Sequence, residues 1–409
     1  MIDVRPMVRP HSSVANPSAD AAAVLRRLGF AILAFAIPVG ALFTRRAVVV
    51  LAPLAVTLLV LAAILDGPPK HVRERLIGLA GSPGGLAGAV LLFWMGLSLV
   101  WTPFLPEASE RLLNIAGMAL MAVAGFVAMP ERMRSANLYL LPVGIGLAAL
   151  TGTALAWRNK SGVDPEDGSL ERGMIVLVLL LWPAVTWLHS RGRNLEGGIL
   201  ALIVAAGAFF ATDGLPLQGL AAGAVVFALT VVNPSAGARL TAFAMAGLLL
   251  LGPVLPFILE PLAAGLLGPR SPAVASLDLW GRIILADPLS LVTGHGFETT
   301  LRSKVSGLLP SAAPNTFLFE IWYELGLVGA VAAAVLLYRT ALAAGGHRPV
   351  LGPGIMAAFA TAYALGCFGI GTAQVWWFTA LVLVVLVFVA IERGQFRTKR
   401  PKAILRRAS

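Results

Sequence analysis

The chain has 409 residues, of which 58% are hydrophobic and only 12% are charged. Soluble domains carry about 25% charged residues. This composition, with a mean hydropathy of +0.85, therefore excludes a soluble globular protein. The single cysteine, Cys367, excludes an intramolecular disulfide and a metal cluster built from cysteines.

In chain order, the sequence divides into a polar arm, a long apolar region and a basic tail. Residues 1–27 lack the apolar core of a signal peptide, so we expect a disordered cytoplasmic arm. Residues 28–391 form the predicted membrane domain of an all-α polytopic protein, with about twelve transmembrane helices. The predicted spans are 28–44, 47–65, 84–101, 112–129, 136–157, 173–189, 197–212, 216–233, 239–262, 316–338, 351–370 and 373–391. For the basic cytoplasmic tail, 392–409, we expect anionic lipids as the partner and no nucleic acid.

The distribution of basic residues predicts the orientation of these spans. With the N-terminus in the cytoplasm, 21 of the 31 Lys and Arg residues fall in cytoplasmic segments. Cytoplasmic loops of membrane proteins carry an excess of Lys and Arg. We therefore expect both termini in the cytoplasm.

One large outer loop, about residues 263–315, follows from this orientation. A loop of this length in a compact protein is usually functional or disordered. The stretch 271–287 predicts an amphipathic helix that begins at a Ser-Pro signal, and "TGHGF" predicts a turn after it.

Three residues near the outer face are candidates for a general base. The sequence contains no Walker motif, no dinucleotide-binding fingerprint and no Cys/His spacing typical of a metal site, so we expect neither a cofactor nor a metal. His295 is the only predicted outer histidine, and Glu320 and Glu324 lie one helical turn apart. The alternatives are a turn residue for His295 and interior acids paired with an arginine for the two glutamates.

Four basic residues of the outer face suit a ligand that carries phosphate. They are Arg172, Arg282, Arg302 and Lys304. The guanidinium group presents a planar pair of donors to phosphate oxygens. The alternative interpretation is solvated surface charge.

Four stretches resemble the O-antigen ligase and polymerase superfamily of bacterial inner-membrane proteins. They are "FWMGLSLVWTPFLPEASERLLN", "ERGMIVLVLLLWP", "SLDLWGRIILADPLSLVTGHGF" and "PNTFLFEIWYELGLVGA". The resemblance covers roughly residues 90–390 and rests on the order of these loose motifs. It implies an α-helical glycosyltransferase that needs no metal or nucleotide. Such a protein takes a glycan from an undecaprenyl-pyrophosphate donor at the periplasmic face.

The resemblance also implies site residues. Arginines at the positions of Arg172 and Arg282 would hold the pyrophosphate, and Asn315 would lie at the substrate. Where the family usually reads His-Pro-His-Asn, this chain reads Ala312, Ala313, Pro314 and Asn315, so the expected base is absent. His295, followed by Glu320, is then the first replacement.

The function expected from the sequence is glycan transfer in the assembly of cell-surface polysaccharide. The acceptor would be a lipid A core sugar, as in lipopolysaccharide, or another glycan chain. Two alternatives remain open: a family member without catalysis, and a transporter, flippase or assembly partner for lipid-linked glycan.

Overall fold

The structure is a computed structural model of the whole chain, and it describes residues 17–67, 72–131, 138–159, 168–211, 214–346, 348, 350–372 and 374–394. These ranges are helical and contain no strand. The helices are α1 (Pro17–Ala31), η1 (Ile32–Ala36), α2 (Ile37–Gly40), α3 (Ala47–Leu65), α4 (Val72–Ala80), α5 (Pro83–Ser98), α6 (Leu105–Ala128), α7 (Leu140–Asn159), α8 (Ser169–Ser190), α9 (Asn194–Phe210), α10 (Leu215–Val232), α11 (Pro234–Leu250), α12 (Leu255–Leu267), α13 (Pro272–Ala286), α14 (Ser290–Thr293), α15 (Thr299–Val305), α16 (Phe317–Gly345), α17 (Gly352–Phe368) and α18 (Val375–Gly394).

The described ranges have the helices of a multi-pass membrane protein. Eight helices are long and apolar enough to cross a membrane, and the number is ten if each of two bent helix pairs is one span. Two shorter apolar helices, α9 and α17, accompany them. Each predicted apolar run coincides with one or more of these helices.

The predicted span 239–262 is wrong as a single straight helix. The chain bends by 96° between α11 and α12. The indole of Trp322 donates a hydrogen bond to the Leu249 carbonyl at 2.7 Å, where α11 ends. A Cβ on Gly252 would lie 2.6 Å from the Trp322 ring, so the packing at the bend requires glycine there. α12 therefore departs from the direction of α11 and lies against α13, which falls within the stretch predicted as the outer loop.

The prediction of a disordered arm over 1–27 is wrong for its last part, because α1 begins at Pro17. Arg26, on this helix, forms an ion pair with Asp66 at the end of α3. Residues 1–16 and 395–409 lie outside the described residues, and so does most of the basic tail for which anionic lipids are expected.

The predicted helix at 271–287 is confirmed as α13. The hydroxyl of Ser271 accepts a hydrogen bond from the Val274 amide at 3.4 Å, and Pro272 occupies the first turn. This is the Ser-Pro start that the sequence indicates, since the first amides of a helix have no partner within it.

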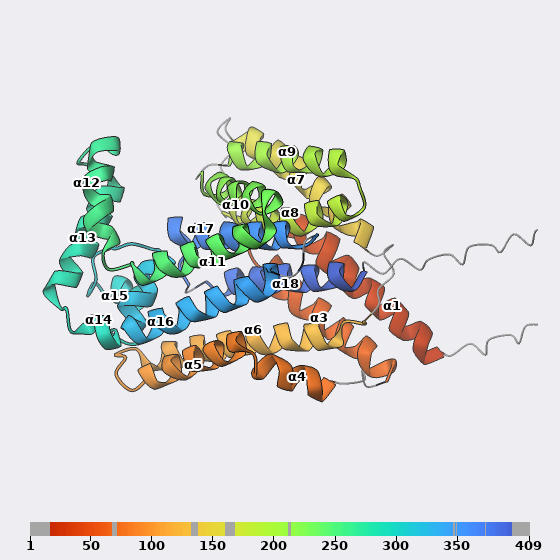
Figure 1. Cartoon of the computed structure of the whole chain (residues 1–409), viewed down its shortest axis with the longest axis horizontal. Coiled ribbons are helices and arrows are strands. Elements are labelled where there is room, and N and C mark those ends of the chain that lie inside the picture. The colour runs from red at the N-terminus through yellow and green to blue at the C-terminus, as the bar shows by residue number, and fades with distance from the viewer. Residues whose placement is uncertain are drawn as a thin grey trace, which may run out of the picture.

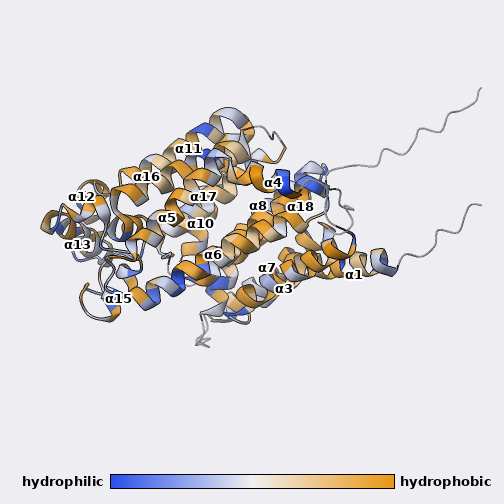
Figure 2. Cartoon of the chain, turned by 90° about the horizontal axis from the view of Figure 1, so that it is seen from below, coloured by the Kyte–Doolittle hydropathy of each residue, from blue (hydrophilic) through white to orange (hydrophobic). Residues whose placement is uncertain are grey.

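The long helices run roughly side by side, with α12 to α15 gathered at one end (Figure 1). We call this the loop end. The start of α1 and the end of α18 lie at the opposite end. Figure 2 shows hydrophobic residues along the long helices and many of the hydrophilic residues towards the two ends.

The helix α16 is broken near the loop end. Gly326 has φ 61° and ψ −157°, so the helical hydrogen-bond ladder is interrupted there. The freed carbonyls find other donors: the His295 amide reaches Tyr323 O at 2.8 Å, and the Gly296 amide reaches Glu324 O at 3.0 Å. The indole of Trp94 donates to Leu325 O at 2.9 Å. The "GHGF" turn thus substitutes for a missing helical turn, which allows a break within an apolar helix.

We expect Gly326→Ala to destabilise the protein by more than about 1 kcal/mol, because alanine is strained at positive φ. A Cβ there would also lie 2.6 Å from the Val292 carbonyl oxygen. The matched control is Gly247→Ala on α11, where a Cβ meets nothing within 4 Å. The control should be neutral or stabilising by up to about 1 kcal/mol. Unfolding in SDS, followed by circular dichroism, measures both, and equal stability of the two variants would contradict the strained break.

Candidate functional site

A buried charged cluster lies beneath the "GHGF" turn. Arg111, on the first turns of α6, is only 8% exposed. It forms ion pairs with Glu298, just after the turn, and with Glu324 on α16, the latter at 3.4 Å. Its guanidinium also donates to the Thr372 hydroxyl and lies 4.6 Å from the centroid of the Phe297 ring. One arginine therefore connects α6, the segment after the "GHGF" turn, α16 and the α17–α18 connection.

Glu320 extends this group towards the α17–α18 connection. It accepts hydrogen bonds from the Thr372 amide and, at 2.6 Å, from the Thr372 hydroxyl. A Cβ on Gly371 would lie 2.3 Å from Glu320 Oε1, so the backbone approaches the carboxylate closely. We call Arg111, Glu298, Glu320, Glu324 and Thr372 the Arg111 cluster.

Glu298 has an unusual backbone conformation. At φ 66° it is the one described residue other than glycine with a positive φ. This conformation costs an L-residue roughly 1–2 kcal/mol, and such strain persists where surrounding contacts enforce it. Burial raises the pKa of the Glu298 carboxyl above its usual value, and the positive charge of Arg111 opposes that rise.

Glu324 completes the junction between α16 and the outer loop. Its Oε1 atom accepts a hydrogen bond from the Thr300 amide at 3.2 Å, on the first turn of α15. Arg302, one helical turn after Glu298, places its Nε atom 3.4 Å from Glu298 Oε1. For Glu324 the structure thus matches the alternative of an interior acid paired with an arginine.

His295 lies at the turn, against Tyr323. The two rings stack with centroids 4.1 Å apart, and His295 Nδ1 is 3.1 Å from the Tyr323 carbonyl oxygen. Its Nε2 atom is 3.9 Å from Asp287 Oδ2, and the side chain is 31% exposed. These contacts match the alternative of a turn residue that hydrogen-bonds a neighbour.

Lys304 contacts the segment from Ala313 to Asn315. Its ammonium donates to the Ala313 carbonyl at 2.7 Å, to the Pro314 carbonyl at 3.1 Å and to the Asn315 side chain. Burial lowers the pKa of Lys304, and the nearby charge of Glu320 opposes that shift. Lys304 and Asn315, both predicted to bind substrate, are therefore in contact with each other.

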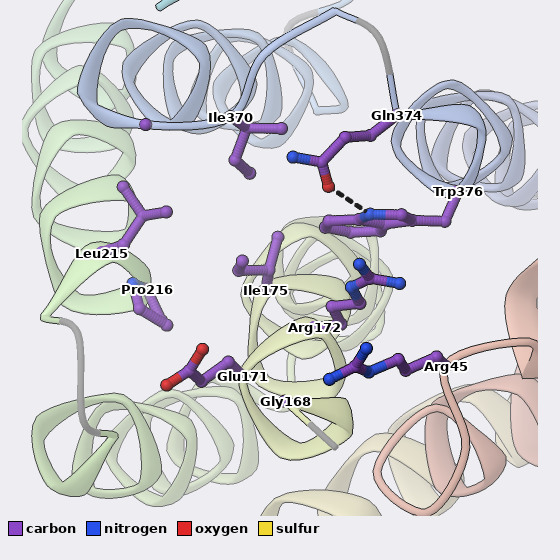
Figure 3. A pocket seen from close by; sticks show the side chains of 11 residues that line it. Arg45, Gly168, Glu171, Arg172, Ile175, Leu215, Pro216, Ile370, Gln374 and Trp376 are labelled. Carbon is purple, nitrogen blue, oxygen red and sulfur yellow. Dashed lines mark hydrogen bonds between the residues drawn. The ribbon is translucent and has the colours of Figure 1, made fainter. Parts of the chain in front are cut away.

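A second site, the Arg172 pocket, lies at the starts of α8, α10 and α18 (Figure 3). It has a volume of about 260 Å³, and Arg45, Glu171, Arg172, Gln374 and Trp376 are among its lining residues. The Arg172 guanidinium lies 5.4 Å from the centroid of the Trp376 ring, and Gln374 Oε1 accepts a hydrogen bond from the Trp376 indole. Two guanidinium groups and one carboxylate make this pocket basic.

The pocket is adjoined by a second hollow of about 400 Å³. Arg45, Arg172 and Trp376 line both hollows. Arg46, Val49, Val50 and Val375 complete the lining of the second one. Val50, on α3, is 58% exposed. The basic pocket thus continues onto an apolar surface of the helix bundle.

The structure places Arg45, rather than Arg282, beside Arg172. Arg282 lies on α13 with its side chain 75% exposed and forms an ion pair with Asp278 at 2.7 Å. Among the described residues that line the two hollows, neither Arg282 nor His295 occurs. Arg282 therefore matches the alternative of solvated surface charge.

The two sites share the connection between α17 and α18. Gly369, Ile370 and Gln374 line the Arg172 pocket, while Thr372 binds Arg111 and Glu320. A movement of this connection would therefore change both sites together.

Sequence reasoning missed Arg111, Glu298, Thr372 and Arg45. The sequence did contain an indication of Arg111, because this basic residue directly precedes the apolar run 112–129. Such a residue usually faces a protein interior and has a partner there. Glu298 follows the "GHGF" motif directly, but nothing in the sequence marks Thr372.

Comparison with known proteins yields no match. No protein-family model matches the chain, and no curated protein or solved structure is detectably similar to it. The case for a function therefore rests on the motifs, the Arg111 cluster and the Arg172 pocket.

Proposed function

We propose that this protein is an O-antigen-ligase-like glycosyltransferase that takes a glycan from an undecaprenyl-pyrophosphate donor at the loop end. The observation that carries the proposal is the Arg172 pocket, in which Arg45 and Arg172 adjoin a hollow with the apolar side chains Val49 and Val50. A lipid-linked pyrophosphate needs a basic pocket beside an apolar surface. The pocket would bind its charged group, and the apolar surface would contact its hydrocarbon chain. Three of the four stretches that resemble the superfamily contact one another, through Trp94 and Leu325, Thr102 and Phe297, and His295 and Tyr323.

In this proposal, the guanidinium groups of Arg45 and Arg172 bind the pyrophosphate oxygens. A general base takes the proton of the acceptor hydroxyl, whose oxygen then attacks the anomeric carbon of the donor glycan. The bond from that carbon to the pyrophosphate oxygen breaks, and undecaprenyl pyrophosphate leaves. Arginine charge stabilises the leaving group, so the reaction requires no metal.

The test is glycan transfer by the purified protein in liposomes that contain the lipid-linked donor. We expect Arg45→Ala and Arg172→Ala each to lower transfer about 10- to 150-fold, since a hydrogen bond to a charged group contributes about 1.5–3 kcal/mol. Arg172→Lys should restore transfer only partly, because lysine lacks the planar pair of donors. The exposed Arg282→Ala is the matched control and should transfer at the normal rate. Normal transfer by both pocket variants, at normal protein levels, would contradict the proposal.

A transporter or flippase for lipid-linked glycan is the second candidate. The break of α16 at Gly326, next to the buried Arg111 cluster, favours it, since discontinuous helices with charged groups are typical of transporters. Transport predicts movement of labelled donor across the liposome membrane without a new glycosidic bond. A catalytically inactive family member would show neither activity but would still bind the donor.

We further propose about twelve spans, with α9 and α17 crossing the membrane as well, and both termini in the cytoplasm of a bacterial inner membrane. Reporter fusions after Gly307 and after Arg397 should then report opposite sides of the membrane. Reports from the same side would contradict this topology.

A further inference from the structure

We propose that α12 lies in the outer leaflet of the bilayer as an interfacial anchor for the loop end. Its exposed apolar face would be inserted among the upper acyl chains of the lipids. This role is independent of the glycan-transfer reaction.

The geometry of α12 fits an interfacial helix. It has 13 residues, about 20 Å of helix, which is too short to cross a hydrocarbon core of about 30 Å. The bend of 96° turns it away from the direction of α11. If α11 crosses the membrane, α12 runs nearly parallel to the membrane plane, as its position across the end of the bundle indicates (Figure 1).

One face of α12 is apolar and exposed. Ile258, Leu262 and Leu266 follow one another at helical spacing and are 53%, 57% and 85% exposed. Leu259, on the same face, is 42% exposed. In water these side chains would form an apolar patch without a partner, which marks a site of interaction.

The second helix of the hairpin, α13, carries an exposed ion pair. α12 packs closely against α13, where a Cβ on Gly281 would lie 3.3 Å from the Phe257 ring. α13 carries Asp278 and Arg282 as an exposed ion pair, and the exposed Ala275 and Leu285, the latter 71% exposed, lie on the same face. The exposed apolar face thus belongs to α12, and the exposed charges of this hairpin belong to α13, as an interfacial element requires.

The lipid bilayer is the occupant that the surroundings favour. The exposed apolar surface continues along the chain into the bend and α11, where Val254, Leu251 and Phe243 are 47%, 54% and 70% exposed. Eight helices of the described ranges are long and apolar enough to span a membrane. The turn after α12 carries the exposed Arg270, whose guanidinium can bind the phosphate of a lipid headgroup.

The test uses the full-length protein with Cys367→Ala, so that one introduced cysteine can carry an environment-sensitive fluorophore. The reporter position is Leu266→Cys on α12, and the matched control is Ala275→Cys on α13, on the face that carries Asp278 and Arg282. Both variants are reconstituted in vesicles of phosphatidylcholine and phosphatidylglycerol. We expect the fluorophore at position 266 to show blue-shifted emission that is quenched by lipids with a nitroxide on the upper acyl chain. The fluorophore at position 275 should be quenched by aqueous iodide. Iodide quenching at both positions, without lipid quenching at Leu266, would overturn the proposal.

A second variant tests the role of the apolar face itself. With the fluorophore at Ile258→Cys, the changes Leu262→Ser and Leu266→Ser should abolish most of the lipid quenching. Both side chains are exposed, so the fold should tolerate the changes. Unchanged lipid quenching would contradict insertion driven by this face. A disulfide between two copies at Leu266→Cys, with no lipid quenching, would instead identify a second copy of the chain as the occupant.

Discussion

Replacing Arg111 with methionine is expected to lower the free energy of unfolding by about 3–5 kcal/mol, the cost of leaving buried charges without their partner. Arg111 is 8% exposed, and the change would leave Glu298 and Glu324 without the guanidinium between them. Unfolding in SDS, followed by circular dichroism, measures this loss. A second readout is protease cleavage within the outer loop, which Arg111 connects to α6.

The matched control for Arg111→Met is Arg282→Met. The ion pair of Arg282 with Asp278 is exposed to solvent, and exposed pairs contribute about 0–1 kcal/mol. Adding Glu298→Gln and Glu324→Gln to Arg111→Met should recover part of the stability, since the unpaired charges are then removed. Similar losses for the two arginine variants would contradict the assignment of the Arg111 cluster as the link between the loop and the bundle.

The second large effect concerns the general base, and we expect Glu320→Gln to lower glycan transfer by about 100- to 10,000-fold. Glu320 is hydrogen-bonded to Thr372, on the connection that also lines the Arg172 pocket through Gly369, Ile370 and Gln374. Glutamine has the same shape and can still accept both hydrogen bonds from Thr372, so the fold should persist. The loss should therefore be in kcat, with donor binding retained.

His295→Ala distinguishes the two candidate bases. The His295 ring stacks on Tyr323 and hydrogen-bonds a backbone carbonyl, so we expect a loss of transfer below about tenfold. A loss of transfer of about 100- to 10,000-fold for His295→Ala, with normal transfer by Glu320→Gln, would instead identify His295 as the general base. Normal transfer by both variants would contradict any catalytic role for these residues. No transfer by the unaltered protein would favour the transport or non-catalytic alternative.

The sequence by itself determined the class of the protein and the places of its helices. Apolar runs such as 47–65 and 216–233 coincide with α3 and α10, because burial in lipid depends on composition over a window of about 20 residues. The start of α13 could be predicted for a local reason as well. Ser271 and Pro272 satisfy the first turn of the helix whatever lies around it.

Hydropathy did not show where the apolar helices break. The run 239–262 is continuous in hydropathy, yet it turns by 96°, because Trp322 packs against Gly252 and bonds the Leu249 carbonyl. The break at Gly326 depends in the same way on donors from the "GHGF" turn. Hydropathy measures how apolar a segment is and carries no information on which distant donor reaches a freed carbonyl.

The sequence indicated some residues of the candidate site, and the tertiary structure showed how they pair. Sequence singled out Arg172, Glu320 and Glu324 as charged residues at the edges of apolar runs, where charge is costly and therefore informative. The sequence could not show which arginine pairs with which of these acids. Arg111, the partner of Glu324, lies 213 positions away from it in the chain. Which arginine stands beside which acid depends on how the helices pack. That packing places Arg111 among Glu298 and Glu324, sets Arg45 beside Arg172, and leaves Arg282 in solvent.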